Sequence, residues 1–523
     1  MKKRKNGQPV PQKLKAERHI SAALRIGMAV LTLLLQIVVI LALTLVAKKY
    51  AAMLYLVLEM AALVVALGIF NRNGSVSYRI SWILLVLAVP VAGMILYVLW
   101  GGNRQAKRLS LKRVPPPKER AGDRLESGDN VSRLAHKLPA WERLANYLHK
   151  KGFLLYGNTA VAYFPEGEAF FKDLLERLSR AERFIFLEYY IVAEGSLWNS
   201  VFQVLRRKAD EGVEVKLIFD DFGNITRLTG RTLMEIEAAG VEVQIFNPVH
   251  KYVNRLYFNY RDHRKIAVID GNIAYTGGLN IADEYANLIE RFGHWKDTGV
   301  RLEGEGAWGF TGQFIHMWEM LGGTVDNEHD YYRPQVPGQG VGFCQVFVDG
   351  PMNNPDNPAE DTYFQLITCA RRFLYITTPY LAVEESMVKA LCIAADGGVD
   401  VRLMLPAIPD KKYVYMVAET YFGELMEHGV KIYRYRPGFL HAKSVMVDRE
   451  VALVGTTNMD YRSFQLHYEC GVLLYDMPVV EDLLEDMDAV MAQSSQVTME
   501  EWKQRGFFRQ VMETVLKLFA IWM

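Results

Sequence analysis

The chain has 523 residues and a formal net charge of +1 at pH 7. This length accommodates a membrane region and two domains of ordinary size, and the near-zero charge argues against nucleic-acid binding through a general positive field. The cysteines are widely spaced without a Cys-x-x-Cys pair, which favours buried thiols over a disulfide framework or a zinc site. They are Cys344, Cys369, Cys392 and Cys470.

The first 25 residues are polar and basic, and three apolar runs follow, at about 26–47, 51–70 and 80–100. Each run has nearly the ~20 residues that a helix needs to cross a bilayer. The first run is too long for a signal peptide, and further runs come after it. Residues 1–104 are therefore predicted to be a membrane anchor region of a multi-pass protein of the cell membrane.

The charges that flank these runs constrain their topology. The basic amino-terminal tail and the basic stretch after the third run both favour the cytoplasmic side, which requires an even number of crossings. One of the three runs is then expected to be re-entrant or interfacial. Glu59 in the second run and Pro90 and Gly93 in the third run are the features that favour this. The catalytic part is predicted to lie on the cytoplasmic face.

Residues 105–150 are predicted to be a charged linker, and an internal repeat follows them. The segment at 181–190 matches the one at 370–379, and the segments at 212–219 and 240–248 match later ones. Helical periodicity alternates with short strands that begin after glycines, which indicates α/β sheets covered by helices. We predict two α/β domains, 151–335 and 340–523, in a pseudo-twofold pair with the active site at their seam.

The tail at 505–523 has apolar residues on one helical face and charged residues off it. Two interpretations remain open: an interfacial helix that touches lipid, and a terminal helix packed on its own domain.

Two stretches share one spacing: His, one residue, Lys, four residues, Asp, six residues, Gly, two residues, Asn. The motif residues are His263, Lys265, Asp270 and Asn280 in the first copy and His441, Lys443, Asp448 and Asn458 in the second. Residues two apart on a strand share a face, so that each copy presents an imidazole beside an ammonium. This pair suits a phosphodiester, because the imidazole attacks or protonates while the lysine neutralises non-bridging oxygens.

The duplicated motif resembles that of the phospholipase D superfamily, and the membrane-anchored arrangement is similar to bacterial cardiolipin synthases. The resemblance implies transfer of a phosphatidyl group from one phosphatidylglycerol to another, which gives cardiolipin and glycerol. It also implies a phosphohistidine on His263, with His441 as acid and later base; the motifs themselves do not choose between the two. The chain departs from the family at Gly278, where Ser is common, whereas Thr456 keeps a hydroxyl in the second copy.

Each histidine needs a partner that fixes its tautomer, and Asp297 and Glu469 match the family positions for that carboxylate; the alternative is that they are surface acids. The motif aspartates lie at hairpin turns, where they are expected to hold the motif geometry more than to touch phosphate. The motif asparagines either donate to a phosphate oxygen or cap a helix. His294 and His467 are interpreted as bystanders.

No cofactor is predicted. Asp220 and Asp221 end an apolar strand without further ligands at useful spacing, and two lysines make a cation unnecessary. The predicted partners are phosphatidylglycerol and cardiolipin in the membrane. The alternatives are a membrane phospholipase D with water as acceptor, a phosphatidyltransferase for another alcohol, a nuclease, and a degenerate member that serves as a membrane scaffold.

Overall fold

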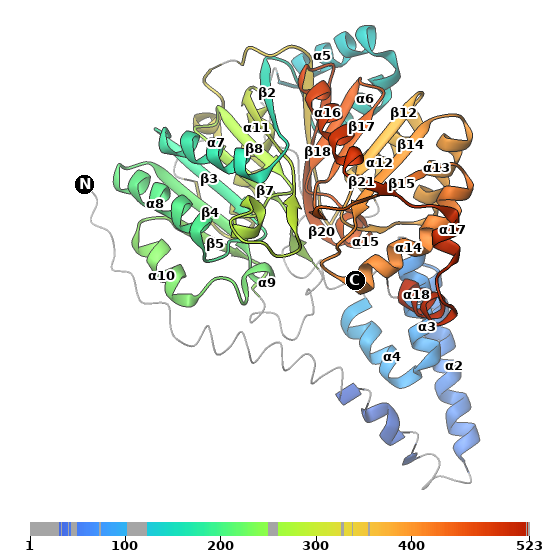
Figure 1. Ribbon diagram of the computed structural model, residues 1–523. Helices are drawn as coiled ribbons and strands as arrows, with labels where there is room; N and C mark the ends of the chain where they lie inside the picture. The colour runs from blue at the N-terminus through green and yellow to red at the C-terminus, as the bar shows by residue number, and fades with distance from the viewer. Residues whose placement is uncertain are drawn as a thin grey trace.

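The computed structural model consists of two α/β domains side by side, with helical hairpins of the amino-terminal region below the second domain (Figure 1). The structure describes residues 31–32, 34–39, 41–42, 50–72, 75–101, 123–248, 260–325, 329–336, 338–353, 356–518 and 520. The apolar run at 26–47 therefore lies largely outside the described residues.

The first domain is built on a mixed seven-stranded sheet in the order β2-β10-β8-β7-β3-β4-β5. These strands are β2 (Thr159–Phe164), β3 (Phe184–Tyr189), β4 (Glu214–Asp220), β5 (Glu242–Phe246), β7 (Lys265–Ile269), β8 (Ile273–Gly277) and β10 (Gly299–Gly304). Its helices are α7 (Gly167–Ser179), α8 (Ser196–Asp210), α9 (Asp221–Asn224), α10 (Gly230–Ala238) and α11 (Ala307–Met320). The first motif occupies the turn into β7 and the β7–β8 hairpin.

The second sheet repeats this order as β11-β20-β18-β17-β12-β14-β15, with β1 and β21 added at its edges. The strands are β1 (Leu155–Tyr156), β11 (Phe343–Asp349), β12 (Phe373–Thr377), β14 (Asp400–Pro406), β15 (Lys431–Tyr435), β17 (Ser444–Val447), β18 (Val451–Gly455), β20 (His467–Tyr475) and β21 (Ser494–Gln496). The helices are α12 (Pro358–Cys369), α13 (Glu385–Asp396), α14 (Lys412–Glu427), α15 (Tyr461–Gln465), α16 (Val479–Ala492), α17 (Met499–Lys503) and α18 (Phe507–Leu518). The repeated order confirms the prediction of two similar α/β domains.

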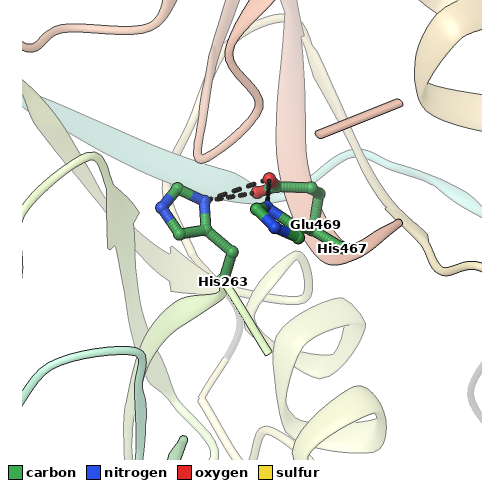
Figure 2. Close-up of side chains that lie close together, drawn as sticks. All are labelled: His263, His467 and Glu469. Atoms are coloured by element: carbon green, nitrogen blue, oxygen red, sulfur yellow. Dashed lines mark hydrogen bonds and ion pairs between the residues drawn. The ribbon is translucent and has the colours of Figure 1, made fainter. Parts of the chain in front are cut away.

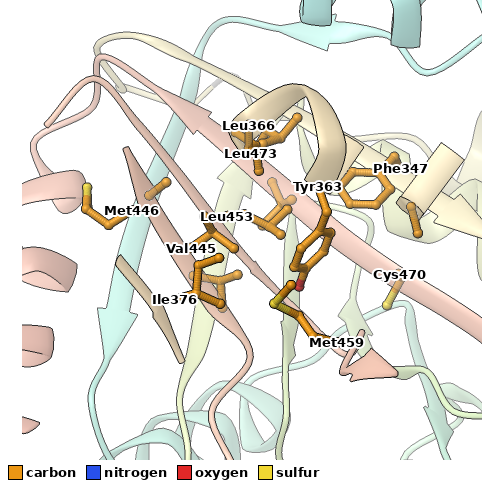
Figure 3. Close-up of a cluster of buried hydrophobic side chains, with 14 of the residues drawn as sticks. Phe347, Tyr363, Leu366, Ile376, Val445, Met446, Leu453, Met459, Cys470 and Leu473 are labelled. Carbon is orange, nitrogen blue, oxygen red and sulfur yellow. The ribbon is translucent and has the colours of Figure 1, made fainter. Parts of the chain in front are cut away.

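One apolar interior joins the two domains. The central strands are rich in β-branched and aromatic residues; β7, with the sequence Lys-Ile-Ala-Val-Ile, is buried on both faces. Helix α11 packs on β3 and β7 of the first sheet and on β11 of the second. Gly309 permits the close approach, since a Cβ there would lie 2.6 Å from the Cβ of Val346. Figure 3 shows the part of this core around Tyr363 and Leu453. Burial of each such side chain contributes roughly 1.5–3 kcal/mol.

Part of the stretch predicted as a linker is folded. Residues 123–150 form α5 (Asp123–Lys137) and α6 (Glu142–Lys150), which pack against β1 and α12. Leu134, Trp141 and Leu148 have no exposed surface, and the Trp141 Nε1 donates to Glu450 Oε2 at 2.7 Å. These helices therefore belong to the body of the second domain.

Of the three apolar runs, the structure describes the second and the third, and only the second forms one continuous helix. Among the described residues, only α2 (Ala51–Phe70) is long and apolar enough to cross a membrane. The third run breaks at Val89 into α3 (Val76–Ala88) and α4 (Pro90–Leu96), followed by a π-helical turn at Tyr97–Gly101. Pro90 cannot donate the backbone hydrogen bond that a continuous helix requires. Gly93 lets α4 fold back on α3, since a Cβ there would overlap the backbone of Leu85.

Candidate active site

The two motifs meet at a cavity of about 450 Å³ that both domains line. His263 and His441 are 8% and 6% exposed, and both contribute to the cavity wall. The structure thus places the two motif histidines together at the seam between the domains.

Two very short parallel pairings across the seam place the histidines. Strand β6 (Arg261–Asp262) pairs with the start of β20, and β9 (His294–Lys296) pairs with β16 (Gly438–Leu440). Each pairing ends in a backbone hydrogen bond from a motif histidine to the other domain. The amide of His263 donates to Tyr468 O at 2.9 Å, and the amide of His441 donates to Lys296 O at 2.7 Å. A buried carboxylate follows each acceptor residue: Glu469 follows Tyr468, and Asp297 follows Lys296.

The carboxylates are exchanged between the domains. Glu469 of the second domain accepts from His263 Nδ1 at 3.0 and 3.1 Å, and Asp297 of the first domain accepts from His441 Nδ1 at 2.6 Å. A carboxylate at this position accepts only, so that Nδ1 carries the proton and Nε2 is left for the substrate. Both carboxylates have no exposed surface. Each domain therefore supplies the histidine of one half-site and the acid of the other.

The motif lysines place two buried positive charges beside the imidazoles. Lys265 Nζ donates to the carbonyl of His263 at 2.5 Å, and Lys443 makes the same contact with the carbonyl of His441. Burial lowers the pKa of Lys265 to about 8 and that of Lys443 to about 7. A bound phosphate anion would stabilise both ammonium groups.

Burial and the neighbouring lysines also disfavour the imidazolium forms. Burial, followed by Lys265 and Lys443, holds the pKa of His263 well below its usual range. Burial and Lys443 lower the pKa of His441 to about 4, against the opposing effect of Asp297. Both imidazoles are thus neutral near pH 7 in the free site, and an anionic substrate favours the protonation of one of them.

The two half-sites differ at one motif position, which is Gly278 in the first copy and Thr456 in the second. The Thr456 hydroxyl donates to Glu469 Oε2, and it accepts from the amide of Cys470 at 3.0 Å. Gly278 provides no such donor, and a Cβ there would overlap the carboxylate of Asp297. Burial alone would raise the pKa of Asp297, but His441 and Lys443 lower it below its usual value. Asp297 accepts from the Thr298 amide at 2.9 Å, and no side-chain hydroxyl of the described residues donates to it.

The motif asparagines line the cavity, and their contacts differ. Asn280 is engaged: its Oδ1 accepts from the amide of Ile191 at 3.0 Å, and its Nδ2 donates to the Tyr285 hydroxyl at 2.7 Å. The Asn458 Oδ1 is buried and has no hydrogen-bond partner in the described part of the chain. Of the two motif asparagines, Asn458 is thus the one with an unpaired side-chain oxygen next to the cavity, among the described residues.

The motif aspartates lie at the far ends of β7 and β17. Asp270 accepts from three successive backbone amides at residues 182–184, and Asp448 accepts from those at residues 371–373, at distances of 2.7–3.0 Å. Both have positive φ, at 54° and 56°. They bind the hairpin turn to the neighbouring strand and make no hydrogen bond to the cavity histidines among the described residues.

His467 lines the cavity, whereas it was interpreted as a bystander. Its ring lies 5.4 Å from that of His263, and its Nδ1 is 3.6 Å from Glu469 Oε1 (Figure 2). Arg462 Nε lies 3.3 Å from His467 Nε2. His467 and Glu469 are two residues apart on β20, so that their side chains lie on the same face. This His-x-Glu spacing was the sequence signal that could have identified His467. His294 does not line the cavity; its Nδ1 lies 3.2 Å from the Tyr435 hydroxyl.

His263, His467 and Glu469 have donor atoms within 4.8 Å of one another, a spacing that a metal ion could use. The hydrogen bond between His263 and Glu469 already joins two of these groups. Two buried lysines add positive charge that opposes a cation. We therefore interpret the trio as a hydrogen-bonded His263–Glu469 pair with His467 beside it; among the described residues, the Nδ1 of His467 makes no hydrogen bond. Asp220 instead caps α9 and pairs with Arg261 at 3.0 Å.

Two histidines, each with a carboxylate partner and an adjacent lysine, occupy matching positions of a duplicated α/β fold, and these groups suit phosphodiester chemistry. The family described as "Cardiolipin synthase, PLD-like domain" matches residues 174–290 and 363–491, and "Phospholipase_D-nuclease N-terminal" matches residues 60–102. The phosphatidylserine synthase of Haemophilus influenzae has a similar fold, with a TM-score of 0.55 at 15% identity over 73% of this chain and 97% of that one. The two family matches define the class as the phospholipase D superfamily, and the solved structure agrees with the fold.

The similar sequences define the family more narrowly. A cardiolipin synthase of Alkalihalophilus pseudofirmus is 34% identical over 89% of this chain and 93% of its own length. Cardiolipin synthase 2 of Bacillus anthracis is 33% identical over 88% and 90%. An uncharacterized protein of Streptococcus mutans is 38% identical over 84% and 95%. The chain belongs to the cardiolipin synthase family, and it is a membrane-associated protein.

Proposed function

We propose that this protein is a cardiolipin synthase that transfers a phosphatidyl group from one phosphatidylglycerol to another through a phosphohistidine. The observation that carries this proposal is the pair of carboxylate-bound histidines, one from each domain, at one cavity. The family membership supports phosphatidylglycerol as the substrate. No nucleotide-activated donor is needed, because the His–P bond retains the energy of the phosphodiester.

In the first half-reaction, Nε2 of His263 attacks phosphorus and the P–O bond to the terminal glycerol breaks. His441 donates its Nε2 proton to the leaving alkoxide, and glycerol departs. In the second half-reaction, the terminal hydroxyl of a second phosphatidylglycerol gives its proton to His441 and attacks phosphorus. The N–P bond breaks, cardiolipin leaves, and both histidines return to their starting states. Lys265 and Lys443 supply positive charge for the anionic transition states.

The difference between the half-sites supports this assignment of roles. A donor to a carboxylate stabilises its charge and weakens its pull on a partner proton, so that the Thr456 hydroxyl makes Glu469 the weaker partner. Asp297 accepts from the Thr298 amide on its other oxygen, accepts from no hydroxyl among the described residues, and lies closer to its histidine. His441 is therefore the better proton carrier and His263 the better neutral nucleophile.

We also propose that the catalytic domains lie on the cytoplasmic face of the cell membrane. In this arrangement the run at 26–47 and α2 each cross the bilayer once, and the α3–α4 hairpin does not cross. Both basic segments are then cytoplasmic. Membrane-impermeant maleimide should label a Lys48→Cys variant from outside the cell, and Lys13→Cys and Glu119→Cys variants only after permeabilisation. External labelling of Glu119→Cys would overturn this topology.

The proposed reaction is tested with purified protein in vesicles that contain phosphatidylglycerol alone. We expect cardiolipin and glycerol in equal amounts without CTP or CDP-diacylglycerol, and added glycerol should convert cardiolipin back. A denaturing quench should trap an acid-labile, base-stable lipid–protein adduct that the His263→Ala variant lacks. Phosphatidic acid as main product would instead identify the hydrolase, which is the second candidate function. An absolute need for CDP-diacylglycerol would refute the mechanism.

A further inference from the structure

The carboxy-terminal helix α18 has its amphipathic faces reversed relative to an ordinary packed helix. Its apolar side faces outward: Phe507 and Phe508 are 73% and 87% exposed. The other exposed apolar side chains are Val511, Met512, Val515 and Leu518. Glu513, on the opposite side, is 2% exposed. A helix that served only as packing against its own domain would present the opposite arrangement.

An ionic cluster around two buried carboxylates, Glu419 and Glu513, holds this orientation. Arg505 and Arg509 pair with Glu513 at 2.6 and 2.9 Å, and Arg509 also pairs with Glu419 of α14. Arg434 holds the other oxygen of Glu419 at 2.9 Å. To bury the phenylalanines, α18 would have to roll over and strip these charges of their partners, which is strongly unfavourable for buried ions.

The helix also adjoins the membrane anchor. The carbonyl of Leu518 accepts from the Ser81 hydroxyl of α3 at 2.8 Å. The start of α3 is held to the second domain, since Ser77 donates to Glu384 at 2.9 Å and accepts from the Tyr461 hydroxyl at 3.1 Å. Figure 1 shows α18 beside α3, at the end of the anchor that is nearer to the catalytic domains. The exposed apolar face of α18 therefore continues an apolar surface that already belongs to the membrane region.

The same corner of the molecule forms part of the active-site wall. Val414 and Val417 of α14 line the cavity, as does Ala520 just beyond α18. The cavity of about 450 Å³ has room for a headgroup phosphodiester, but not for acyl chains that each extend through one leaflet, ~15 Å. The acyl chains must therefore lie outside the cavity, and this corner is where apolar surface meets it.

We propose that α18 lies in the interface of the bilayer that α2 crosses, with Phe507, Phe508 and Val511 among the acyl chains. The active-site cavity then opens at the bilayer surface, and the diacylglycerol part of the substrate stays in the lipid while its phosphodiester reaches the histidines. The position of α18 in the bilayer does not depend on the proposed reaction. Only the route of the substrate rests on the proposed function. The occupant of the apolar face is lipid, not a second copy of the chain.

The test measures how deeply α18 is inserted. Full-length protein with Cys369→Ser, which leaves only buried cysteines, receives Val511→Cys on the apolar face and is labelled with an environment-sensitive fluorophore. Matched controls carry Gln510→Cys at the polar flank of the same helix and Arg206→Cys on α8. In phosphatidylglycerol vesicles with chain-brominated lipid, we expect quenching at residue 511 to exceed that at residue 510 at least twofold, with little quenching at residue 206.

Equal quenching at residues 511 and 206 would overturn the proposal. Quenching between labelled copies at residue 511, without quenching by brominated lipid, would show that a second copy covers the face and would equally overturn it. A second measurement uses the Phe507→Ser/Phe508→Ser variant, for which we expect at least a fivefold rise in KM for vesicle phosphatidylglycerol with kcat nearly retained. An unchanged KM would contradict the substrate route. An enzyme without transferase activity would refute the proposed function and leave the quenching result intact.

Discussion

Glu469 accepts a hydrogen bond from Nδ1 of His263 at 3.0 Å across the boundary between the two domains, 206 positions away in the chain. Asp297 of the first domain accepts in the same way from Nδ1 of His441 in the second domain. Neither motif histidine takes its carboxylate partner from its own domain, so that proton transfer at one imidazole depends on the position of the other domain. The experiments below test this interdependence.

Loss of either histidine should abolish turnover almost completely. We expect His263→Ala and His441→Ala each to lower kcat by about 10⁴-fold or more, because both groups act in the same two half-reactions. The double variant should be less than about tenfold worse than either single variant. The measurement is cardiolipin formation by purified variants, and near-normal synthesis by one single variant would disprove a shared site.

Neutral replacement of the exchanged carboxylates should affect catalysis more than folding. Glu469→Gln and Asp297→Asn retain the side-chain shape but no longer stabilise an imidazolium or fix its tautomer. We expect kcat to fall by about 10²–10⁴-fold in each. Thermal unfolding should distinguish this from a structural loss: a variant that is inactive only because it is unfolded would count against the assigned role.

Gly278 should not tolerate the serine that is common at this position in the family. A Cβ at residue 278 would overlap the carboxylate of Asp297 and displace it from His441. Gly278→Ser is expected to lower kcat at least tenfold, and Gly278→Ala should do the same because the Cβ is sufficient. The matched control is Thr456→Ser, which keeps the hydroxyl next to Glu469 and should retain most activity. Full activity of Gly278→Ser would show that Asp297 can move without consequence.

The motif lysines predict a decline of kcat/KM on the alkaline side. The pKa values of Lys443 and Lys265 are lowered to about 7 and about 8, so that the ammonium forms that attract the phosphodiester predominate below these values and are lost above them. Activity should therefore fall as the pH rises from about 7 to 9. Lys443→Arg stays charged in this range, and its profile should lose the lower of the two alkaline steps. A flat profile up to pH 9 would argue against both lysines as charge donors.

Chelation should leave the reaction largely intact. The positive charge at the cavity comes from lysine and arginine side chains, and a hydrogen bond already joins His263 to Glu469. We expect EDTA to change initial rates less than twofold once the ionic strength and vesicle state are controlled. Restoration of a chelated, inactive enzyme by one particular divalent ion would establish a metal site at this trio.

The sequence predicted those parts of the site that repeat. Both motifs lie on matching hairpins because their apolar, β-branched segments favour buried strands, and the repeated order of the sheets follows from the repeated segments. The exchange of Glu469 and Asp297 could not be predicted, because it depends on β6 and β9, two pairings of two and three residues that carry no periodicity. The inward orientation of the His467 side chain could have been predicted from its spacing to Glu469, because residues two apart on a strand share a face.

The membrane region illustrates the same limit. Composition predicted apolar runs, and Pro90 was a visible signal for the break between α3 and α4. The orientation of α18 could not be derived from its own sequence. It depends on Glu419, a buried carboxylate of α14 nearly 90 residues earlier, which attracts the arginine side of the helix inward.

Helix α11 lies between the two sheets, and its residues 307–315 are buried on every side. A segment that is apolar all around and contacts both sheets cannot be shielded from water by either half alone. The boundary near residues 335–340 therefore separates the repeats in sequence but does not separate two foldable units. Calorimetry should record one cooperative melting transition for the catalytic region, and the two halves, produced separately, should aggregate unless they are synthesised together.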